Sequence, residues 1–308
     1  MSEIILHHYP NSPFAEKVRI AFGIKQLSWR SVHIPVIMPK PDLLPLTGGY
    51  RKTPVLQIGA DIYCDTQCIL RELERRFPQP SLYRGTDAGS ANALAFWSDR
   101  NLFSPAVGIG LAGRSTELMT PEFMADRAKF SGRDVNPERL KAAAPMLLDQ
   151  LRAQMGWLET MLADGRPFLL GQHPTLLDCA AYHPCWFIRV NAGAEAAPLT
   201  EFQALQAWMV RVEQIGHGAS SGLDAKEALS IARNASPAAV ALLDARDPAG
   251  RTPGLRVQVV ADDTGRDPVV GELIGSSRDH VTLRRVDPLV GEVAVHFPRA
   301  GFLVQPAP

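Results

Sequence analysis

Ser12 stands where a helix begins and could interact with an anion there. It directly precedes Pro13, and the apolar residues that follow recur at mostly helical spacing; a serine N-cap followed by proline is a strong helix-start signal. The first N–H groups of a helix are unpaired and the helix dipole favours negative charge, so a thiolate beside Ser12 would have a lowered pKa. The serine hydroxyl could donate one hydrogen bond to that sulfur. The alternative is that Ser12 only caps the helix.

Two further segments could bind a ligand that has an amino-acid backbone. Thr53-Pro54 precedes a short apolar run. If this peptide bond is cis, Thr53 presents its N–H and C=O sideways to a ligand backbone, whereas a trans proline would only begin a strand. Asp65-Thr66 opens the next helix. The pair could cap that helix, or Asp65 could pair with the ammonium of an α-amino acid while the Thr66 hydroxyl and N–H hold its carboxylate.

Other polar residues are interpreted as structural. Thr175 and Asp178 have capping-box spacing, which is a folding signal. His7 and His8 are neighbours on a predicted strand and face opposite sides, so they cannot jointly hold a metal. Neither a CxxC motif nor zinc-ligand spacing occurs, so we expect no metal and interpret all four cysteines as packing residues. These cysteines are Cys64, Cys68, Cys179 and Cys185.

The elements that position these residues precede a long helical region. Residues 1–80 alternate strand and helix signals in the order βαβ, loop, ββα. Residues 86–235 show helical periodicity without a convincing strand, strongest over 138–162, which predicts a helical bundle. Pro184 falls inside one of its helices, so we expect that helix to kink or end near His183.

The composition changes near residue 236. Residues 236–254 contain several Pro and Gly and indicate a linker, and residues 250–308 are predicted to form a small β-rich extension. Short valine-rich runs separated by Gly, Asp and Pro favour a small antiparallel β-barrel. The runs are Arg256–Val260, Val269–Ile274, Val281–Val286, Glu292–Phe297 and Phe302–Val304.

The overall composition excludes several classes of partner. A chain of 308 residues allows about two domains and a small third. Its 32 basic and 32 acidic side chains sum to zero formal charge, so it lacks the field that attracts nucleic acid or an anionic membrane surface. No apolar run approaches the ~18 residues that a membrane span needs, and the N-terminal segment does not resemble a signal peptide. We therefore expect a cytoplasmic protein without nucleic-acid or membrane partners.

Four segments, taken together and in order, resemble the cytosolic glutathione S-transferase superfamily. They are YPNSPFAEKVR with Ser12, KTPVL with Pro54, CDTQCIL with Asp65-Thr66, and HPTLLDCAAY with the capping box. The resemblance covers about residues 1–220. It implies an α/β domain of thioredoxin-like fold over 1–80, an all-α helical-bundle domain over 86–235, and a homodimer. The β-rich extension lies outside the common pattern.

The resemblance also implies roles for individual residues. Ser12 matches the catalytic serine of the serine-type classes. The Thr53 backbone and a cis Pro54 match the binding site for the cysteinyl part of glutathione, and Asp65 and Thr66 match the pair that binds its γ-glutamyl group.

Lys52 stands where a basic residue often precedes this motif, and could favour the glycyl carboxylate of glutathione. The usual asparagine-proline-glycine lead-in of the family is replaced here by residues 46–52.

The resemblance implies an enzyme that conjugates the thiolate of glutathione, its co-substrate, to a small hydrophobic electrophile. Serine at position 12 cannot form a mixed disulfide, which favours conjugation over thiol–disulfide chemistry. The alternative is a glutathione-binding or scaffold protein with little catalysis that associates through its C-terminal β domain. Candidate walls of the electrophile pocket are Phe14, Trp97, Arg100, Phe103 and Val107.

Overall fold

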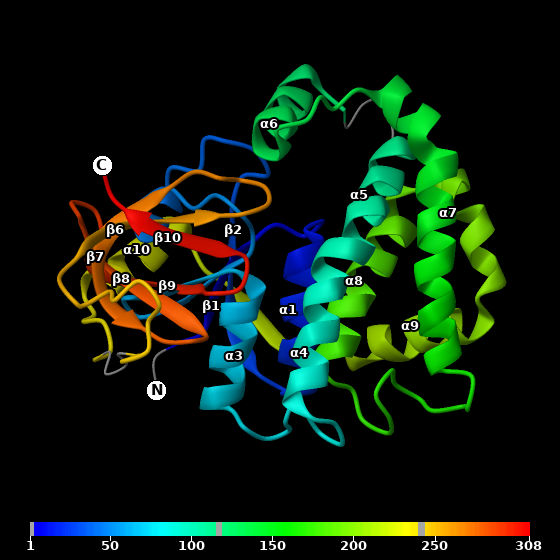
Figure 1. The fold of residues 1–308 in the computed structure, drawn as a ribbon, viewed down its shortest axis with the longest axis horizontal. Helices are drawn as coiled ribbons and strands as arrows, with labels where there is room; N and C mark the ends of the chain where they lie inside the picture. Colours follow the sequence, from blue (N-terminus) through cyan, green and yellow to red (C-terminus); the bar gives the residue numbers. More distant parts are fainter. Residues whose placement is uncertain (1–2, 115–118, 240–243) are drawn as a thin grey trace.

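A computed structural model describes residues 3–114, 119–239 and 244–308. Its N-terminal part has the thioredoxin-like arrangement that the resemblance implies (Figure 1). Strand β1 pairs in parallel with β2 and antiparallel with β3, and β3 and β4 form a hairpin. The elements are β1 (Ile5–His8), α1 (Pro13–Ile24), β2 (Ser28–His33), α2 (Leu44–Thr47), β3 (Val55–Ile58), β4 (Asp61–Cys64) and α3 (Thr66–Arg76).

The second part is helical, as expected. A π-helical turn, η1, joins α4 to α5, so that these three elements form one long helix. Helix α6 stands apart from the other helices and lies against the N-terminal part (Figure 1). The elements are α4 (Ala88–Trp97), η1 (Ser98–Leu102), α5 (Phe103–Ala112), α6 (Pro121–Ser131), α7 (Pro137–Met161), α8 (Leu176–Asn191), the 3-10 helix η3 (Gly193–Glu201) and α9 (Gln203–Ile215).

Helix α8 continues through Pro184, so the prediction that it could end near His183 is wrong. A proline inside a helix removes the N–H that would bond to the carbonyl four residues earlier, here Ala180. The hydroxyl of Ser98 donates to this carbonyl over 2.8 Å. Ser98 belongs to η1, so a neighbouring helix supplies the hydrogen bond that the proline removes.

The chain returns to the sheet after α9. Residues Ala219–Gly222 form β5, which pairs in parallel with β2. Helix α10 (Ala225–Arg233) then packs on the sheet, and the Gln57 side chain donates to the carbonyl of Ala228. The expectation that residues 86–235 contain no strand is therefore wrong for β5. Its sequence, ASSG, has no apolar alternation, and it is a strand because the edge of β2 is available for pairing.

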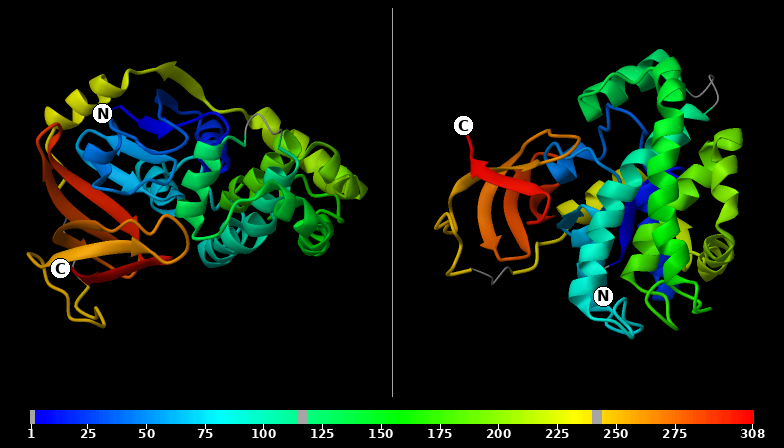
Figure 2. Two further views of the ribbon diagram at one scale, coloured as in Figure 1. Left: turned by 90° about the horizontal axis from the view of Figure 1, so that it is seen from above. Right: turned by 45° about the vertical axis from the view of Figure 1, so that its right-hand side comes forward.

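All five strands expected in the C-terminal extension are present and form an antiparallel sheet. Their order shows what the sequence did not predict: β9 pairs in parallel with β4, so a ten-stranded sheet runs β10-β6-β7-β8-β9-β4-β3-β1-β2-β5. Figure 2 shows the extension curling beside the N-terminal part. The strands are β6 (Arg256–Ala261), β7 (Val269–Ser276), β8 (His280–Asp287), β9 (Gly291–Pro298) and β10 (Phe302–Pro306).

A buried polar contact joins the extension to β4. The ring of His296 stacks on that of Tyr63, with centroids 4.4 Å apart, and its Nε2 lies 2.9 Å from a carboxylate oxygen of Asp61. Its Nδ1 lies 3.1 Å from the hydroxyl of Thr282. Because both ring nitrogens have partners, the buried imidazole carries no unsatisfied polar atom.

Two hydrophobic cores lie on opposite faces of the N-terminal sheet. Alternate residues of β1 show the division: Leu6 packs with the helices of the second part, whereas Ile5 packs with α10 and the extension. Both faces of this sheet are thus covered, and every residue of β1, β3 and β4 is buried.

Candidate functional site

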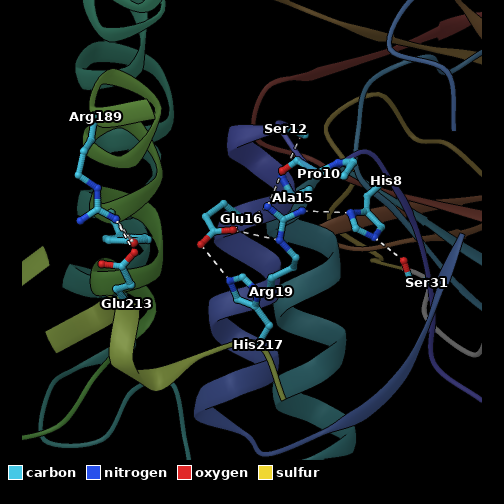
Figure 3. Close-up of polar contacts among 11 residues, drawn as sticks. His8, Pro10, Ser12, Ala15, Glu16, Arg19, Ser31, Arg189, Glu213 and His217 are labelled. Carbon is cyan, nitrogen blue, oxygen red and sulfur yellow. Dashed lines mark hydrogen bonds and ion pairs between the residues drawn. The ribbon is translucent and has the colours of Figure 1, made fainter. Parts of the chain in front are cut away.

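Ser12 caps α1, as its position before Pro13 predicts. Its hydroxyl accepts a hydrogen bond from the N–H of Ala15 over 3.2 Å, and only 2% of the residue is exposed (Figure 3). Accepting this bond leaves the hydroxyl hydrogen available for donation. The cap interpretation of Ser12 is confirmed, and the geometry is compatible with a second role as donor to a ligand.

A buried network below Ser12 holds the turn that leads into α1. The Arg19 guanidinium donates to the carbonyl of Pro10 over 2.8 Å and pairs with Glu16 over 2.6 Å (Figure 3). Glu16 in turn contacts His217, 3.0 Å away, which follows α9. Burial and the nearby Arg19 lower the pKa of His8 to about 3, so this histidine is neutral. Arg19 therefore positions the Ser12 turn.

Tyr9 belongs to the site, although sequence reasoning overlooked it. Burial raises the pKa of its phenol, while Arg127 and the hydroxyl of Ser12 act in the opposite direction. The phenol is therefore neutral at physiological pH and lies close to Ser12. The signal available in the sequence was its place at the end of β1, three residues before Ser12.

The Thr53–Pro54 peptide bond is cis, as the resemblance implies. The side chain of Thr53 accepts a hydrogen bond from the ammonium of Lys40 over 3.1 Å, and Lys40 also donates to the carbonyl of Arg51. Lys40 is a second residue that the sequence did not single out. Burial, together with Arg127 and Arg51, lowers the pKa of its ammonium to about 7.

Asp65 and Thr66 begin α3. A carboxylate oxygen of Asp65 accepts from the N–H of Gln67, which confirms the cap, and burial raises the pKa of this carboxyl. In the described part of the chain no basic group lies within salt-bridge distance of Asp65. The Thr66 hydroxyl accepts from the ammonium of Lys17 over 3.0 Å. An unpaired carboxylate thus lies beside a hydroxyl backed by a cation.

Lys17 connects this pair to the helical part of the molecule. Its ammonium also lies 2.6 Å from a carboxylate oxygen of Asp99, whose other oxygen contacts His183. Burial alone would raise the pKa of Asp99, but the nearby Lys17 and His183 lower it below its ordinary value. Asp99 lies in the π-helical turn η1, a feature that occurs frequently at functional sites.

The C-terminal extension reaches several of the expected site residues. Asp263 pairs with Lys52 over 2.5 Å, and Asp262 pairs with Arg100 over 2.6 Å. The Gln67 amide donates to the carbonyl of Ala300 over 3.3 Å. The β6–β7 loop therefore reaches Lys52 and η1, and the β9–β10 turn lies beside the start of α3. Lys52 already has a carboxylate partner.

Of the expected pocket residues, the structure brings Phe14 and Phe103 together. Their rings are 4.7 Å apart, and both lie against the ring of His183. Val107 is one helical turn beyond Phe103 and shares its face of α5. Trp97 instead packs near Trp157, and Arg100 lies over Phe96 and pairs with the extension.

A cavity of about 280 Å³ lies between α3 and α4. Its lining includes Lys17, Gln67, Phe96 and Ala300. It adjoins the Lys17–Thr66 contact and does not include Ser12. The extension therefore contributes to the wall of a cavity next to the start of α3.

The four cysteines are buried and none forms a disulfide, which agrees with the packing interpretation. Burial raises the pKa of every one of these thiols, so they are protonated. Among the residues that the structure describes, no cluster of His, Cys, Asp and Glu could hold a metal ion. No helix in the described ranges is both long and apolar enough to cross a membrane.

Comparison with known proteins agrees with this arrangement. Residues 6–81 match the family model of the glutathione S-transferase N-terminal domain, and residues 112–221 match a domain of unknown function (DUF7962). A GST-like protein of Pseudomonas syringae is 40% identical, with all of both chains covered and a TM-score of 0.79. The chain belongs to the glutathione S-transferase superfamily.

Two more distant proteins each match about two thirds of the chain. FtsZ-localized protein A of Caulobacter vibrioides is 24% identical over 217 residues, which are 68% of this chain and 87% of the relative. The structure of a glutathione S-transferase from Rhodospirillum rubrum is 21% identical, covers 68% of this chain and 87% of its own, and has a TM-score of 0.54. The latter similarity concerns the fold alone.

Proposed function

We propose that this protein binds glutathione and activates its thiol for attack on a small electrophilic molecule. The observation that carries the proposal is the unpaired carboxylate of Asp65 beside the hydroxyl of Thr66 and the ammonium of Lys17. A γ-glutamyl group ends in an α-amino acid, with one ammonium and one carboxylate. Asp65 complements the ammonium, and the Thr66 hydroxyl backed by Lys17 complements the carboxylate.

In this proposal Ser12 and the N-terminus of α1 act on the sulfur. An ordinary thiol with a pKa near ~8.5 is mostly protonated at neutral pH. The Ser12 hydroxyl donates to the sulfur, and the helix N-terminus favours its negative charge from the N–H of Phe14 onwards, because Pro13 has no N–H. The thiol proton goes to solvent. The thiolate then forms a carbon–sulfur bond, and the leaving group departs with the electron pair of the broken bond.

A second candidate function is a binding or scaffold protein with little catalysis. It is favoured by the extension, whose Asp263 already neutralises Lys52 at the expected glutathione site. The name of the Caulobacter relative associates that protein with FtsZ. In this alternative the present chain likewise associates with a protein partner, with the extension as part of the contact surface.

Glutathione binding by wild type and Asp65→Asn, measured by calorimetry, tests the proposed site. Asparagine remains a good N-cap and tolerates the positive φ of 75° at this position, so the variant removes the charge and keeps the helix start. We expect binding to weaken by about 1.5–3 kcal/mol, roughly 10- to 150-fold. Asp87→Asn, at the exposed cap of α4, is the matched control. Equal affinity of all three proteins would contradict the site.

Thiolate absorbance of bound glutathione and turnover of 1-chloro-2,4-dinitrobenzene separate the two candidate functions. An enzyme lowers the pKa of the bound thiol and releases chloride. Binding with an unchanged thiol pKa and no turnover would replace the enzyme by the scaffold alternative.

The homodimer and the cytoplasmic location are also part of this proposal, supported by membership of the superfamily. Light scattering of the full chain should give twice the mass of one chain. A single-chain mass at micromolar concentration would contradict the dimer.

A further inference from the structure

Four basic side chains gather on the side of Tyr9 that faces α6: Lys40, Arg51, Arg114 and Arg127, here called the cationic cluster. The guanidinium groups of the three arginines lie over two phenylalanine rings of α6. Arg114 and Arg127 lie 4.7 and 5.6 Å from the centre of the Phe123 ring. Arg51 and Arg127 lie 5.4 and 4.9 Å from that of Phe130. The rings hold three like charges close together in a preformed arrangement.

The cationic cluster has too few acids to balance it. Asp126 is the one carboxylate among the described residues that pairs with it, through Arg51 and Arg127. Lys40 donates to neutral oxygens of Arg51 and Thr53. Among the described residues, three guanidinium groups thus have one carboxylate between them, an arrangement that is costly for buried charges unless an anion joins them.

Unused hydrogen-bond donors point to the same conclusion. Arg51 is 4% exposed, yet its Nε has no hydrogen-bond partner among the described residues. The buried Nε of Arg114 also lacks one within the described ranges. Buried donors of charged groups are normally satisfied, so these groups are arranged for an acceptor that residues 3–114, 119–239 and 244–308 do not supply.

The cluster borders the position proposed for the sulfur. The Lys40 ammonium lies 5.8 Å from the centre of the Tyr9 ring and 3.1 Å from the Thr53 hydroxyl, so Lys40 and Arg51 lie on the side of Thr53. Arg127 shares the carboxylate of Asp126 with Arg51, and Arg114 shares the ring of Phe123 with Arg127. The cluster therefore extends from the Tyr9–Thr53 side of the proposed sulfur position to α6.

We propose that Arg114 and Arg127 bind a negatively charged oxygen group on the electrophilic substrate. This inference rests on the proposed function. The substrates of this protein are then acidic electrophiles, with a carboxylate or a similar group placed so that the electrophilic carbon reaches the sulfur beside Ser12. Arg114 offers its Nε, unused among the described residues, to such a group, and Arg127, whose Nε and Nη2 donate to Asp126, offers its Nη1. Helix α6 acts as a specificity element because its phenylalanines orient both arginines.

A matched pair of aryl chlorides tests this proposal. With 4-chloro-3,5-dinitrobenzoate and the corresponding carboxamide, the thiolate forms a carbon–sulfur bond, chloride leaves with the electron pair, and the thiol proton goes to solvent. We expect wild type to prefer the carboxylate at least 10-fold in kcat/KM. Arg127→Gln and Arg114→Gln should each lower the carboxylate rate about 10-fold and leave the amide rate within about 2-fold. Arg139→Gln, an exposed arginine of α7 paired with one acid, is the control.

Equal rates for the two substrates in wild type, or equal losses for both in the variants, would overturn the proposal. A parallel measurement does not need turnover: calorimetric binding of unreactive 3,5-dinitrobenzoate and its amide to the full chain. Preferential binding of the acid that Arg127→Gln abolishes supports the anion site even if the proposed catalysis fails. If Arg127→Gln instead weakens glutathione and leaves the acid preference unchanged, the cluster serves the carboxylate of glutathione and the proposal is wrong. If Arg127→Gln does not fold, the same binding measurements on Arg114→Gln test the anion site.

Discussion

The Lys52 ammonium lies 2.5 Å from a carboxylate oxygen of Asp263, a residue 211 positions later in the chain. This contact ties the β6–β7 loop of the extension to the residue just before Thr53. The same loop reaches α6, because the N–H of Gly265 donates to the carbonyl of Phe130. The extension is therefore in direct contact with both the expected glutathione site and the helix that carries part of the cationic cluster.

Asp263→Asn should tighten glutathione binding by roughly 2- to 5-fold, about 0.4–1 kcal/mol, the range of a partly exposed ion pair. The variant frees Lys52 and removes a negative charge near the ligand's carboxylate. Calorimetry measures the change, which should shrink in high salt. Glu272→Gln, which breaks an exposed pair elsewhere in the extension, should have no effect. Weaker binding in Asp263→Asn would show that the extension helps to form the site.

Ser12→Ala should lower turnover at pH 7 by about 10- to 100-fold, or ~1.4–2.8 kcal/mol, because the sulfur loses a donor. Glutathione affinity should change little, since Thr53, Asp65 and Thr66 supply most contacts in the proposed site. Loss of the cap should also cost about 1 kcal/mol of folding stability. Ser12→Thr, which keeps a hydroxyl, should recover activity. A bound-thiol pKa that is the same in wild type and Ser12→Ala would leave Ser12 as a cap alone.

Asp178→Ala should cost far more stability than an ordinary cap. Its buried carboxylate accepts hydrogen bonds from the N–H of Leu169, the N–H and hydroxyl of Thr175, and the indole of Trp208. Leaving these donors without an acceptor should destabilise the fold by about 3–5 kcal/mol. Asp224→Ala, at the exposed cap of α10, should cost about 1 kcal/mol. Denaturant unfolding compares the two, and similar losses would contradict the role of burial.

Ser98→Ala should destabilise the protein by about 1–2 kcal/mol, because the Ala180 carbonyl loses its donor. In a Pro184→Ala background the restored N–H can bond to this carbonyl, so removing the Ser98 hydroxyl should cost much less. A double-mutant cycle measured by thermal unfolding reports this coupling. Additive effects would show that Ser98 does not compensate for Pro184.

The protein should lose stability as the pH falls from about 6.5 to 4. Burial lowers the pKa of His7 to about 4, whereas the unfolded chain has the ordinary value near 6.5. Between these values the unfolded state binds a proton that the folded state does not, so His7 by itself lowers the stability by roughly 3 kcal/mol as the pH falls. His8, whose pKa is lowered to about 3, adds to this loss over the same range. Urea unfolding of wild type and His7→Gln over this range measures the slope. The variant should show a shallower pH dependence, and identical slopes would exclude His7 as the cause.

The sequence by itself determined the order of elements, most helix starts and the strands of the extension. Ser12 before Pro13, and Thr175 three residues before Asp178, are local patterns whose hydrogen bonds close within one helical turn. The short valine-rich runs of the extension, separated by Gly, Asp and Pro, likewise specify strands without reference to their partners. Such patterns predict structure from sequence because each interaction joins residues that are neighbours in the chain.

Only the tertiary structure decided which distant groups meet. Strand β5 forms because β2 has a free edge for pairing. Helix α8 continues through Pro184 because the Ser98 hydroxyl donates to the Ala180 carbonyl. Lys52 is expected to face a ligand, yet folding gives it a carboxylate from the extension. The cationic cluster joins the loop before β3 to Arg114, which follows α5, and to α6 in the same way. These contacts depend on how surfaces formed by separate segments fit together. No local sequence pattern predicts such a contact between residues that are far apart in the chain.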